Sequence, residues 1–432
     1  MKTVNIGIIG FGTVGAGVAE TILNNGKLIA DRTGFMPVLK RVADLDITTD
    51  RGVVLPEGVL TTSSMEILDD PDIHIVVELI GGTTIAREFI LRALQCGKSV
   101  VTANKALLAT HGEELFRVAS EHGCDIGFEA SVGGGIPCIK ALREGLVGNH
   151  IKTVLGILNG TCNYILTRME NEHADFADVL SAAQAAGYAE ADPALDVDGI
   201  DTAHKAAVLA SLAFGQWFQA KDVHVQGIRS VTVNDIDYAA EMGYRIKLLA
   251  IIKEINNRIE LGVQPALVPA NSLIGNVNGV FNAVWVQGDI VGNTMYYGRG
   301  AGRQATASAV IADIVDIGFN LLRNCTQRLP AFKTYKQYDG LMASEQIVSR
   351  YYIRLQIEDK PGVLAKVSGL LGTHGISIAT VAQKELAMPA VPMIILTHKA
   401  PERSILDAMT AIGALPEVFE KPVLFRLEEL EQ

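Results

Sequence analysis

The strongest constraint on the fold is a glycine pattern that directly follows the first predicted strand. Residues 4–9 form a β-branched apolar run, and they are followed by the hexapeptide Gly10-Phe11-Gly12-Thr13-Val14-Gly15. A helix is predicted from about residue 14 to 25, with Gly26 as its stop. Between a strand and a helix, G-x-G-x-x-G allows a tight turn, and the backbone can closely approach a pyrophosphate at the helix N-terminus. The sequence therefore favours a dinucleotide-binding turn over a glycine turn that serves packing alone.

The N-terminal part alternates predicted strands with predicted helices. Apolar runs at residues 73–79, 99–102 and 125–128 predict strands, and the first of them is apolar throughout, as in strands buried on both faces. Strands connected by helices favour a parallel sheet with right-handed crossovers. We therefore predict an α/β Rossmann-type parallel sheet over residues 1–135.

The pattern changes after about residue 154. Helical segments between residues 161 and 215 precede strand segments that are punctuated by Gly and Asn, from about residue 223 to 297. This pattern predicts an α+β substrate-binding and dimerisation domain over residues 136–302. The chain is then expected to return to the first domain over about residues 303–345.

Residues 350–428 show a third pattern. Strands are predicted at residues 351–357, 376–381, 393–397 and 423–427, and helices at about 361–373 and 402–412. The order βαββαβ predicts a small, self-contained domain.

The composition excludes several kinds of partner. A net charge of −11 argues against a general affinity for nucleic acid or anionic membrane. No apolar stretch approaches the roughly 20 residues of a membrane span, and the N-terminus lacks the features of a signal peptide. The five cysteines are odd in number and show no paired metal-ligand spacing. We therefore expect a reduced, cytoplasmic location with no nucleic-acid or membrane partner.

Charged residues on the second predicted strand leave the choice of dinucleotide open. The strand carries Lys40 and Arg41 and ends near Asp44. An acidic residue at this place binds the ribose hydroxyls of NAD, whereas a basic pair suits the 2′-phosphate of NADP. Solvated surface charges are the alternative. We predict NADP, with Arg41 as a ligand, and keep NAD as the second choice.

Lys105 lies just after the strand that ends at Thr102. It therefore belongs to the carboxyl edge of the sheet, which faces the ligand crevice in open α/β folds. A solvated loop lysine is the alternative reading. We predict a site role for Lys105.

Asp201 and Lys205 are four residues apart in a predicted helix and are neighbours on one face. The same stripe continues through the apolar residues Val208 and Leu212, so Lys205 is expected to project from a partly buried face of the helix. Burial lowers the pKa of a lysine and a nearby carboxylate opposes that shift, so such a pair is suited to proton transfer. Carbonyl reduction by hydride needs such a proton donor, because the developing alkoxide must be protonated. From spacing alone, an ordinary ion pair on a helix surface, worth roughly a few tenths of a kcal/mol, remains the favoured alternative.

Six segments together resemble the homoserine dehydrogenase family. They are GFGTVG (10–15), NKA (104–106), EASVGGGIP (129–137), GILNGTCNYIL (156–166), GYAEADPALDVDGIDTAHK (187–205) and GRGAG (298–302). The matches span most of residues 1–320 in the family's order. The resemblance implies the reversible NAD(P)H-dependent reduction of L-aspartate 4-semialdehyde to L-homoserine, on the route to threonine and methionine.

The resemblance also implies the role of individual residues. Lys205 would be the general acid/base, Glu190 and Asp201 would hold polar groups of the substrate, Asp196 would be a supporting carboxylate, and Lys105 would touch both substrate and nicotinamide. The dinucleotide turn itself would contact the cofactor, with further contacts near the nicotinamide from Gly187 and Gly302.

The family further implies a monovalent cation, sodium, in EASVGGGIP. It would be held, largely by carbonyl oxygens, at Glu129, Val132, Gly134 and Ile136. Such oxygens are suitable hard ligands, although the residues alone indicate only a tight loop. One departure is Ala305, where the family usually has proline, and it bears on where the following helix begins.

The C-terminal segment resembles an ACT domain, a module that often binds amino acids for feedback control. Its signature is EDKPGVL (358–364), where backbone N–H groups at a helix start are suited to a carboxylate. Gly375 stands where the family often has asparagine, so one ligand side chain is missing. The resemblance predicts an effector such as threonine and a homodimer or homotetramer; a module that only dimerises subunits is the alternative.

Two other functions are compatible with parts of the sequence. A semialdehyde dehydrogenase that forms a cysteine thioester would use Cys138 or Cys162, but neither lies beside an obvious basic partner, and small packing residues are the better interpretation. A non-catalytic protein that senses nucleotides and amino acids would not need Lys105, Glu190 and Lys205 together.

Overall fold

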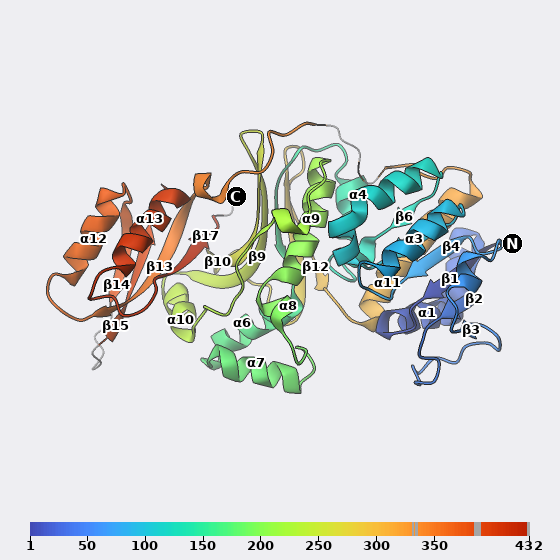
Figure 1. Cartoon of the computed structure of the whole chain (residues 1–432), viewed down its shortest axis with the longest axis horizontal. Coiled ribbons are helices and arrows are strands. Elements are labelled where there is room, and N and C mark those ends of the chain that lie inside the picture. The colour runs from blue at the N-terminus through green and yellow to red at the C-terminus, as the bar shows by residue number, and fades with distance from the viewer. Residues whose placement is uncertain (331, 333–335, 384–389, 430–432) are drawn as a thin grey trace. The chain divides into compact units, whose positions relative to one another are not determined.

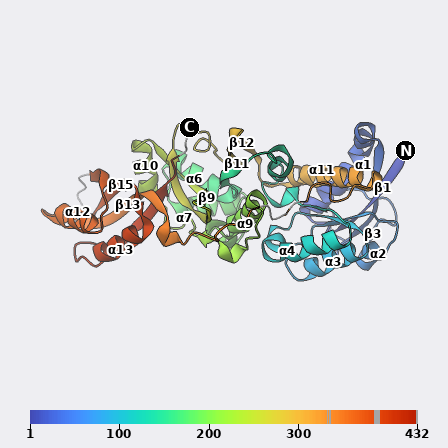
Figure 2. The ribbon, with the colours of Figure 1, turned by 90° about the horizontal axis from the view of Figure 1, so that it is seen from above.

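The computed structural model describes residues 1–330, 332, 336–383 and 390–429. These residues form two compact units (Figures 1 and 2). The first comprises residues 1–160, 201–223 and 281–337, and the second comprises residues 161–200, 224–280 and 338–432. Each unit is described by itself.

The first unit contains a six-stranded parallel sheet of order β3-β2-β1-β4-β5-β6. Its strands are β1 (Lys2–Ile9), β2 (Phe35–Ala43), β3 (Leu60–Thr61), β4 (Ile75–Glu78), β5 (Ser99–Thr102) and β6 (Ile126–Gly127). The strand order reverses between β1 and β4. In such sheets the ligand crevice lies at the carboxyl ends of the strands at this reversal.

Helices cover both faces of this sheet. They are α1 (Thr13–Thr33), α2 (Met65–Leu68), α3 (Ile85–Gln95), α4 (Lys105–Glu121) and α11 (Arg303–Leu322). Ile8 packs in the cluster under α1 and α11, and its neighbour Ile9 packs in the cluster under α2, α3 and α4. Successive side chains of a strand point to opposite faces, so a strand covered on both sides is apolar at every position.

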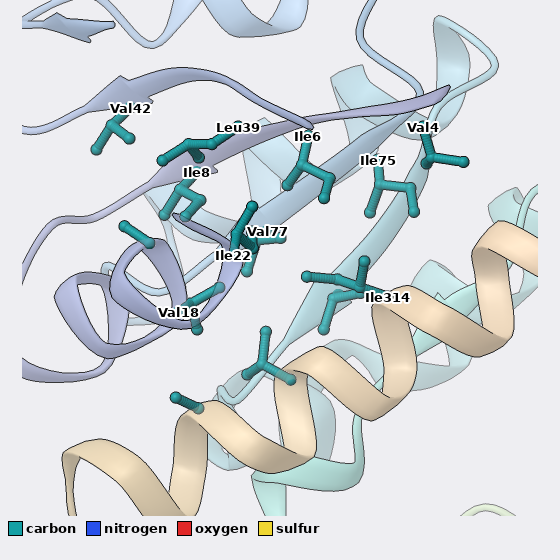
Figure 3. Close-up of a cluster of buried hydrophobic side chains, with 14 of the residues drawn as sticks. Val4, Ile6, Ile8, Val18, Ile22, Leu39, Val42, Ile75, Val77 and Ile314 are labelled. Carbon is teal, nitrogen blue, oxygen red and sulfur yellow. The ribbon is translucent and has the colours of Figure 1, made fainter. Parts of the chain in front are cut away.

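Helix α11 completes the core on the α1 side. Figure 3 shows Ile314 of α11 in the same buried cluster as Ile75 and Val77 of β4 and Val18 of α1. Among the described residues, α11 is the one helix long and apolar enough to cross a membrane by length and composition alone. A helix buried in a globular core has the same composition, and these contacts explain it here.

The predicted stop of the first helix was wrong. Gly26 is a buried interior residue of α1, which continues to Thr33 and ends at Gly34 with φ = 81°. A glycine inside a helix costs only about 1 kcal/mol, and the packing of α1 on the sheet outweighs that cost.

The first unit also contains an antiparallel set, β7 (Ile151–Ile157), β11 (Phe281–Gly288) and β12 (Gly292–Arg299). Helix α9 (Ile200–Phe214) belongs to the same unit, as do a 3₁₀ turn at Glu129–Ser131, α5 (Cys138–Lys140), a π-helical turn at Ala141–Gly145 and a 3₁₀ turn at Ala220–Asp222.

The second unit is built on a mixed sheet of order β9-β10-β17-β13-β15-β14. Its strands are β9 (Tyr244–Ile255), β10 (Arg258–Pro269), β13 (Val348–Glu358), β14 (Ile378–Gln383), β15 (Ala390–Thr397) and β17 (Val423–Leu427), with short β8 (His224–Val225) on β10 and β16 (Ala400–Pro401) on β13. Its helices are α6 (Gly160–Glu172), α7 (Phe176–Ala185), α8 (Ala194–Val197), α10 (Val233–Glu241), α12 (Val363–Thr373) and α13 (Glu402–Gly413), with a 3₁₀ turn at Ser344–Gln346.

The C-terminal part of this unit has the predicted order βαββαβ. Its elements run β13, α12, β14, β15, α13 and β17, and β17 coincides with the predicted strand at residues 423–427. Strand β17 pairs with β13 in antiparallel fashion and with β10 in parallel fashion. The predicted fold class is therefore confirmed, with one pairing that the sequence did not predict.

Candidate active site

The glycine turn after β1 has the geometry that the sequence predicted. Gly10 has φ = 105°, and a Cβ there would lie 2.7 Å from the carbonyl carbon of Leu79. A Cβ on Gly15 would lie 1.9 Å from the Gly10 oxygen. Gly12 is the N-cap of α1, and a Cβ there would meet no atom within 4 Å. The turn is therefore closed on the protein side and open at the N-terminus of α1, where a phosphate is favoured.

The acidic residue after β2 binds the turn itself. The backbone N–H of Phe11 donates to Asp44 Oδ2 at 2.5 Å, and the N–H of Asp46 donates to Asp44 Oδ1 at 2.9 Å. Phe11 is buried, Val14 is half-buried against the core, and Thr13 is exposed. Sequence reasoning placed Asp44 near the ribose but missed this bond, because nothing in the spacing predicts it.

The two basic residues of β2 have different surroundings. Lys40 Nζ lies 2.8 Å from Asp70 and 2.9 Å from Asp72, and the hydrogen bonds that it donates to both carboxylates raise the pKa of Lys40. Arg41 donates to the carbonyl oxygen of Gly58 and lies 3.7 Å from Glu66. The ion pairs of Lys40 are much closer than that of Arg41, which leaves Arg41 as the better candidate for a ligand contact.

Lys105, Asp201 and Lys205 come together as predicted. Asp201 Oδ2 lies 2.6 Å from Lys205 Nζ, and Asp201 Oδ1 lies 3.1 Å from Lys105 Nζ. Lys205 also donates to the Leu158 carbonyl oxygen at 2.6 Å, and Asn159 Nδ2 donates to Asp201 Oδ2 at 3.0 Å. Only 8% of Lys205 and 9% of Asp201 are exposed. The pair is therefore not an ordinary ion pair on a helix surface.

The charges of this cluster are unequal, with two lysines around one carboxylate. Burial alone would raise the pKa of Asp201, but the charges of Lys205 and Lys105 outweigh it and hold that pKa below its usual range. Asp201 is therefore ionised throughout the neutral range. Burial lowers the pKa of the adjacent His204. The cluster suits the binding of an anionic or carbonyl-bearing small molecule next to a proton donor.

Local sequence explains how the three side chains are positioned. Asn104 caps α4, its side-chain oxygen accepting from the N–H of Leu107 at 3.1 Å, so that Lys105 is the first residue of the helix. Asp201 lies in the first turn of α9, where a carboxylate is favoured by the helix dipole, and Lys205 follows one turn later.

Two glycine-rich loops lie against each other in the same unit. A Cβ on Gly134 would lie 2.4 Å from the Gly300 oxygen, and a Cβ on Gly300 would lie 2.0 Å from Asn282 Nδ2. Gly302 has φ = 116° and is the N-cap of α11. The helix begins at Arg303, two residues before Ala305, so the missing proline does not prevent a helix start here.

The four residues predicted to hold a cation all lie in this loop region. The Glu129 carboxylate accepts the N–H groups of Ile139 and Lys140, each at 2.8 Å, while burial raises its pKa. Val132 and Ile136 are buried, and Gly134 has φ = 55°. The described residues contain no group of three or more His, Cys, Asp or Glu that could hold a metal ion.

Gly187, Glu190 and Asp196 belong to the second unit. Gly187 (φ = 75°) and Glu190 are exposed, and Asp196 is half-buried in α8 with its carbonyl oxygen accepting from Cys162 Sγ at 3.2 Å. Their predicted contacts with substrate and cofactor remain predictions.

Sequence reasoning missed Leu158 and Asn159, which contribute a carbonyl oxygen and an amide to the cluster. Both lie in the segment GILNGTCNYIL that carried the family resemblance. They follow β7 directly, and the end of a strand next to a glycine was the signal available.

The surroundings of Cys138 argue against its role as a nucleophile. All five lie in the described part of the chain, and none forms a disulfide. Cys138 is fully buried, and burial raises the pKa of its thiol far above neutrality. A thiolate nucleophile is therefore not available at Cys138.

Comparisons with known proteins agree with this geometry. The family model described as homoserine dehydrogenase matches residues 137–315, that described as homoserine dehydrogenase, NAD binding domain, matches residues 10–129, and the ACT domain model matches residues 351–417. The chain is 45% identical over 437 residues to homoserine dehydrogenase from Pseudomonas aeruginosa, with 100% of each chain covered. It resembles the crystal structure of a homoserine dehydrogenase from Thiobacillus denitrificans, at 45% identity, a TM-score of 0.93 and 99% coverage of each chain. It also resembles a hyperthermophilic archaeal homoserine dehydrogenase in complex with NADPH, at 28% identity and a TM-score of 0.62, with 74% of this chain and 98% of that one covered.

Proposed function

The chain belongs to the homoserine dehydrogenase family, and on that premise we propose that Lys205 is the general acid/base of its reaction. The enzyme is an oxidoreductase that interconverts L-aspartate 4-semialdehyde and L-homoserine. The nicotinamide, when bound at the glycine turn, supplies or accepts the hydride. In the direction of reduction, Lys205 gives a proton to the oxygen of the aldehyde as the hydride arrives at its carbon.

The position of Lys205 carries this proposal. Its amine is buried, and both Asp201 and the Leu158 carbonyl oxygen hold it at 2.6 Å. Such fixed partners define where the proton is delivered, which lowers the entropic part of the barrier. Asp201 orients the amine, and Lys105 is the second cation against which a substrate carboxylate binds. Glu190 and Asp196 would complete the contacts with substrate.

The substitution Lys205→Ala tests this role. We expect kcat to fall by about 10²- to 10⁴-fold with semialdehyde and reduced cofactor, while cofactor affinity is retained. Lys221→Ala removes an exposed lysine of the same unit and serves as the matched control. Near-normal turnover by the Lys205 variant would refute the assignment. If the unsubstituted chain is folded but turns over no cofactor, a sensing protein is favoured instead.

For the cofactor we propose NADP(H), with NAD(H) as the second choice. Lys40 is held by two carboxylates, so Arg41 is the residue available for a 2′-phosphate. The archaeal relative that was solved with NADPH supports the same choice. We expect Arg41→Ala to lower kcat/KM with NADP and to leave that with NAD unchanged, and Lys40→Ala to change neither. A strong NAD preference that Arg41→Ala does not alter would overturn the proposal.

We also propose a monovalent cation, sodium by analogy with the family, at the carbonyl oxygens of Glu129, Val132, Gly134 and Ile136. The fit rests on two observations. The Glu129 side chain is already bonded to backbone N–H groups, which leaves carbonyl oxygens as ligands, and the buried Oδ1 of Asn282, next to Gly300, has no hydrogen-bond partner. A bound cation would add positive charge that fixes the loop. Melting temperatures that are equal in sodium and in a bulky organic cation would contradict it.

For the ACT domain we propose an amino-acid effector such as threonine at the turn that precedes α12. Gly362 is the N-cap of this helix with φ = 92°, so the turn presents its first N–H groups. Activity should fall as threonine is added, and valine, which lacks the hydroxyl group, serves as the control. An activity that stays flat to millimolar threonine, without binding by calorimetry, would remove this proposal.

We propose a homodimer or homotetramer. Exposed apolar side chains at the β11–β12 turn and on β12, namely Ile290, Val291 and Tyr297, support an interface in the first unit. Analytical ultracentrifugation at micromolar concentration measures the oligomeric state, and a monomer would contradict the proposal.

A further inference from the structure

Glu78 is a buried carboxylate at the carboxyl end of β4. None of its side chain is exposed, and no lysine or arginine of the described residues forms an ion pair with it. It accepts only neutral donors: the hydroxyl of Thr102 at 2.7 Å, the N–H of Ile80 at 3.0 Å and the N–H of Gly81 at 3.2 Å. Burial raises the pKa of Glu78, and these hydrogen bonds oppose that rise.

These bonds lead directly to the helix that begins at Lys105. The Thr102 hydroxyl donates to Glu78 and accepts the N–H of Asn104 at 3.0 Å. Asn104 caps α4, and its Nδ2 donates to the Gly82 carbonyl oxygen at 2.7 Å. A shift of the carboxylate is thus transmitted to the first residue of α4 through two hydrogen bonds.

The other side of the same loop contacts the dinucleotide turn. A Cβ on Gly10 would lie 2.7 Å from the Leu79 carbonyl carbon and 2.9 Å from the Ile80 nitrogen. The peptide group between Leu79 and Ile80, which packs on Gly10, therefore carries one of the N–H groups that Glu78 accepts. Gly81 and Gly82 follow with φ = 75° and 73°, so the loop depends on bonds rather than on side-chain packing for its shape.

A buried carboxylate without a cation partner holds this loop at a cost in free energy. Its removal from water costs several kcal/mol, and an apolar side chain would fill the same space more cheaply. Its placement between the two halves of the site calls for a functional reason. We propose that Glu78 is a positioning residue that holds the start of α4, and with it Lys105, in register with the dinucleotide turn. This inference rests on the role of Lys105 proposed above.

The link through Thr102 is the cleanest place to test it. Thr102→Val keeps the shape of the side chain and removes the hydroxyl, whereas Thr102→Ser keeps the hydroxyl. We expect Thr102→Val to lower kcat/KM for L-homoserine by roughly 100-fold, the effect of a misplacement of about 1 Å, with the Kd of the oxidised cofactor close to that of the Ser variant. In Glu78→Gln the side-chain amide accepts hydrogen bonds at its oxygen only. This substitution should therefore lower kcat/KM and weaken cofactor binding.

A double-mutant cycle separates positioning from a general loss of structure. In the Lys105→Ala background, Thr102→Val should change kcat/KM less than about threefold, because the lysine that it positions is gone. An equal loss in both backgrounds, or a Val variant as active as the Ser variant, would overturn the inference. Should the Val variant fail to fold, Asn104→Ser keeps a helix cap and removes the bond to Gly82, and the same cycle applies.

Failure of this inference is distinguishable from failure of the proposed function. If Lys105→Ala is impaired and Thr102→Val is not, only the positioning role of Glu78 is wrong. If Lys105→Ala retains near-normal kcat/KM, the proposed role of Lys105 is wrong, and the positioning inference is overturned with it.

Discussion

Replacement of Gly134 by alanine should destabilise the first unit by an amount that the geometry makes calculable. The new Cβ would lie 2.4 Å from the Gly300 oxygen and 2.5 Å from its carbonyl carbon, at φ = 55°. The left-handed conformation costs alanine roughly 1–2 kcal/mol. Overpacking against backbone, which cannot move aside as a side chain can, adds about 1–3 kcal/mol. Alanine also restricts the unfolded chain, which returns about 0.4–1 kcal/mol.

A second glycine isolates the contact from the conformational penalty. Gly97, also in the first unit, has φ = 75°, and a Cβ there would meet no atom within 4 Å. Gly97→Ala therefore carries only the left-handed penalty and the effect on the unfolded chain. The difference between the two variants should equal the overpacking alone, about 1–3 kcal/mol.

Thermal unfolding followed by circular dichroism measures that difference. For a domain of 150–250 residues, 1 kcal/mol corresponds to about 2–4 °C in Tm. The Gly134 variant should therefore melt roughly 2–12 °C below the Gly97 variant. If the two melt within 1–2 °C of each other, the close approach of the two glycine-rich loops is refuted, and with it the arrangement that the cation proposal uses.

Three further predictions concern buried charges. Asp201→Asn removes the charge that two lysines share, and kcat/KM should fall roughly 10- to 100-fold by the loss of charge-assisted hydrogen bonds; a change below threefold in steady-state kinetics would contradict it. Lys247 donates to the Val277 carbonyl oxygen at 2.7 Å, and burial lowers the pKa of Lys247 from 10.5 to about 8. The contribution of Lys247 to the free energy of unfolding is therefore greatest above pH 10.5 and is lost as the pH falls through 8. Lys247→Met should therefore be less stable in urea than the parent by about 1–3 kcal/mol, and by more at pH 10 than at pH 7; a gap that narrows with rising pH argues against this. Arg426→Met leaves two buried glutamates without their cation and should lose about 3–5 kcal/mol, whereas Arg403→Met, which removes exposed ion pairs, should lose less than about 1 kcal/mol; equal melting temperatures would contradict the contrast.

The cluster of Lys105, Asp201 and Lys205 shows what spacing can and cannot predict. Asp201 and Lys205 are four positions apart in a helix, and that alone makes them neighbours. Spacing carries no information on burial, which is why a surface ion pair remained open until the structure showed both residues to be over nine-tenths buried. The Leu158 carbonyl oxygen that completes the environment comes from 47 residues away in the chain. The family resemblance included the segment that contains Leu158 but assigned no role to its backbone atoms.

The two basic residues of β2 illustrate the same limit for charges. Spacing alone does not separate Arg41, the predicted ligand, from Lys40, because both lie on the second strand of the dinucleotide-binding sheet. Tertiary structure distinguishes them, since Asp70 and Asp72, which hold Lys40, lie in a loop some 30 residues further along. Gly26 is the converse case: local propensity predicted a helix end, and packing on a sheet that the local pattern does not contain overrode it.

The C-terminal module was predicted as self-contained, and its order of elements is as predicted, but its last strand has a second partner. Strand β17 pairs with β13 inside the module and, at Ala266↔Arg426 and Leu267↔Leu427, with β10 outside it. Arg426 bonds to Glu260 of β10 and Glu402 of α13, so one side chain joins the two parts through buried charges. A strand hydrogen-bonded on both edges cannot shift without breaking one ladder. Because β17 pairs with both β13 and β10, any movement of β17 within the module must also act on β10.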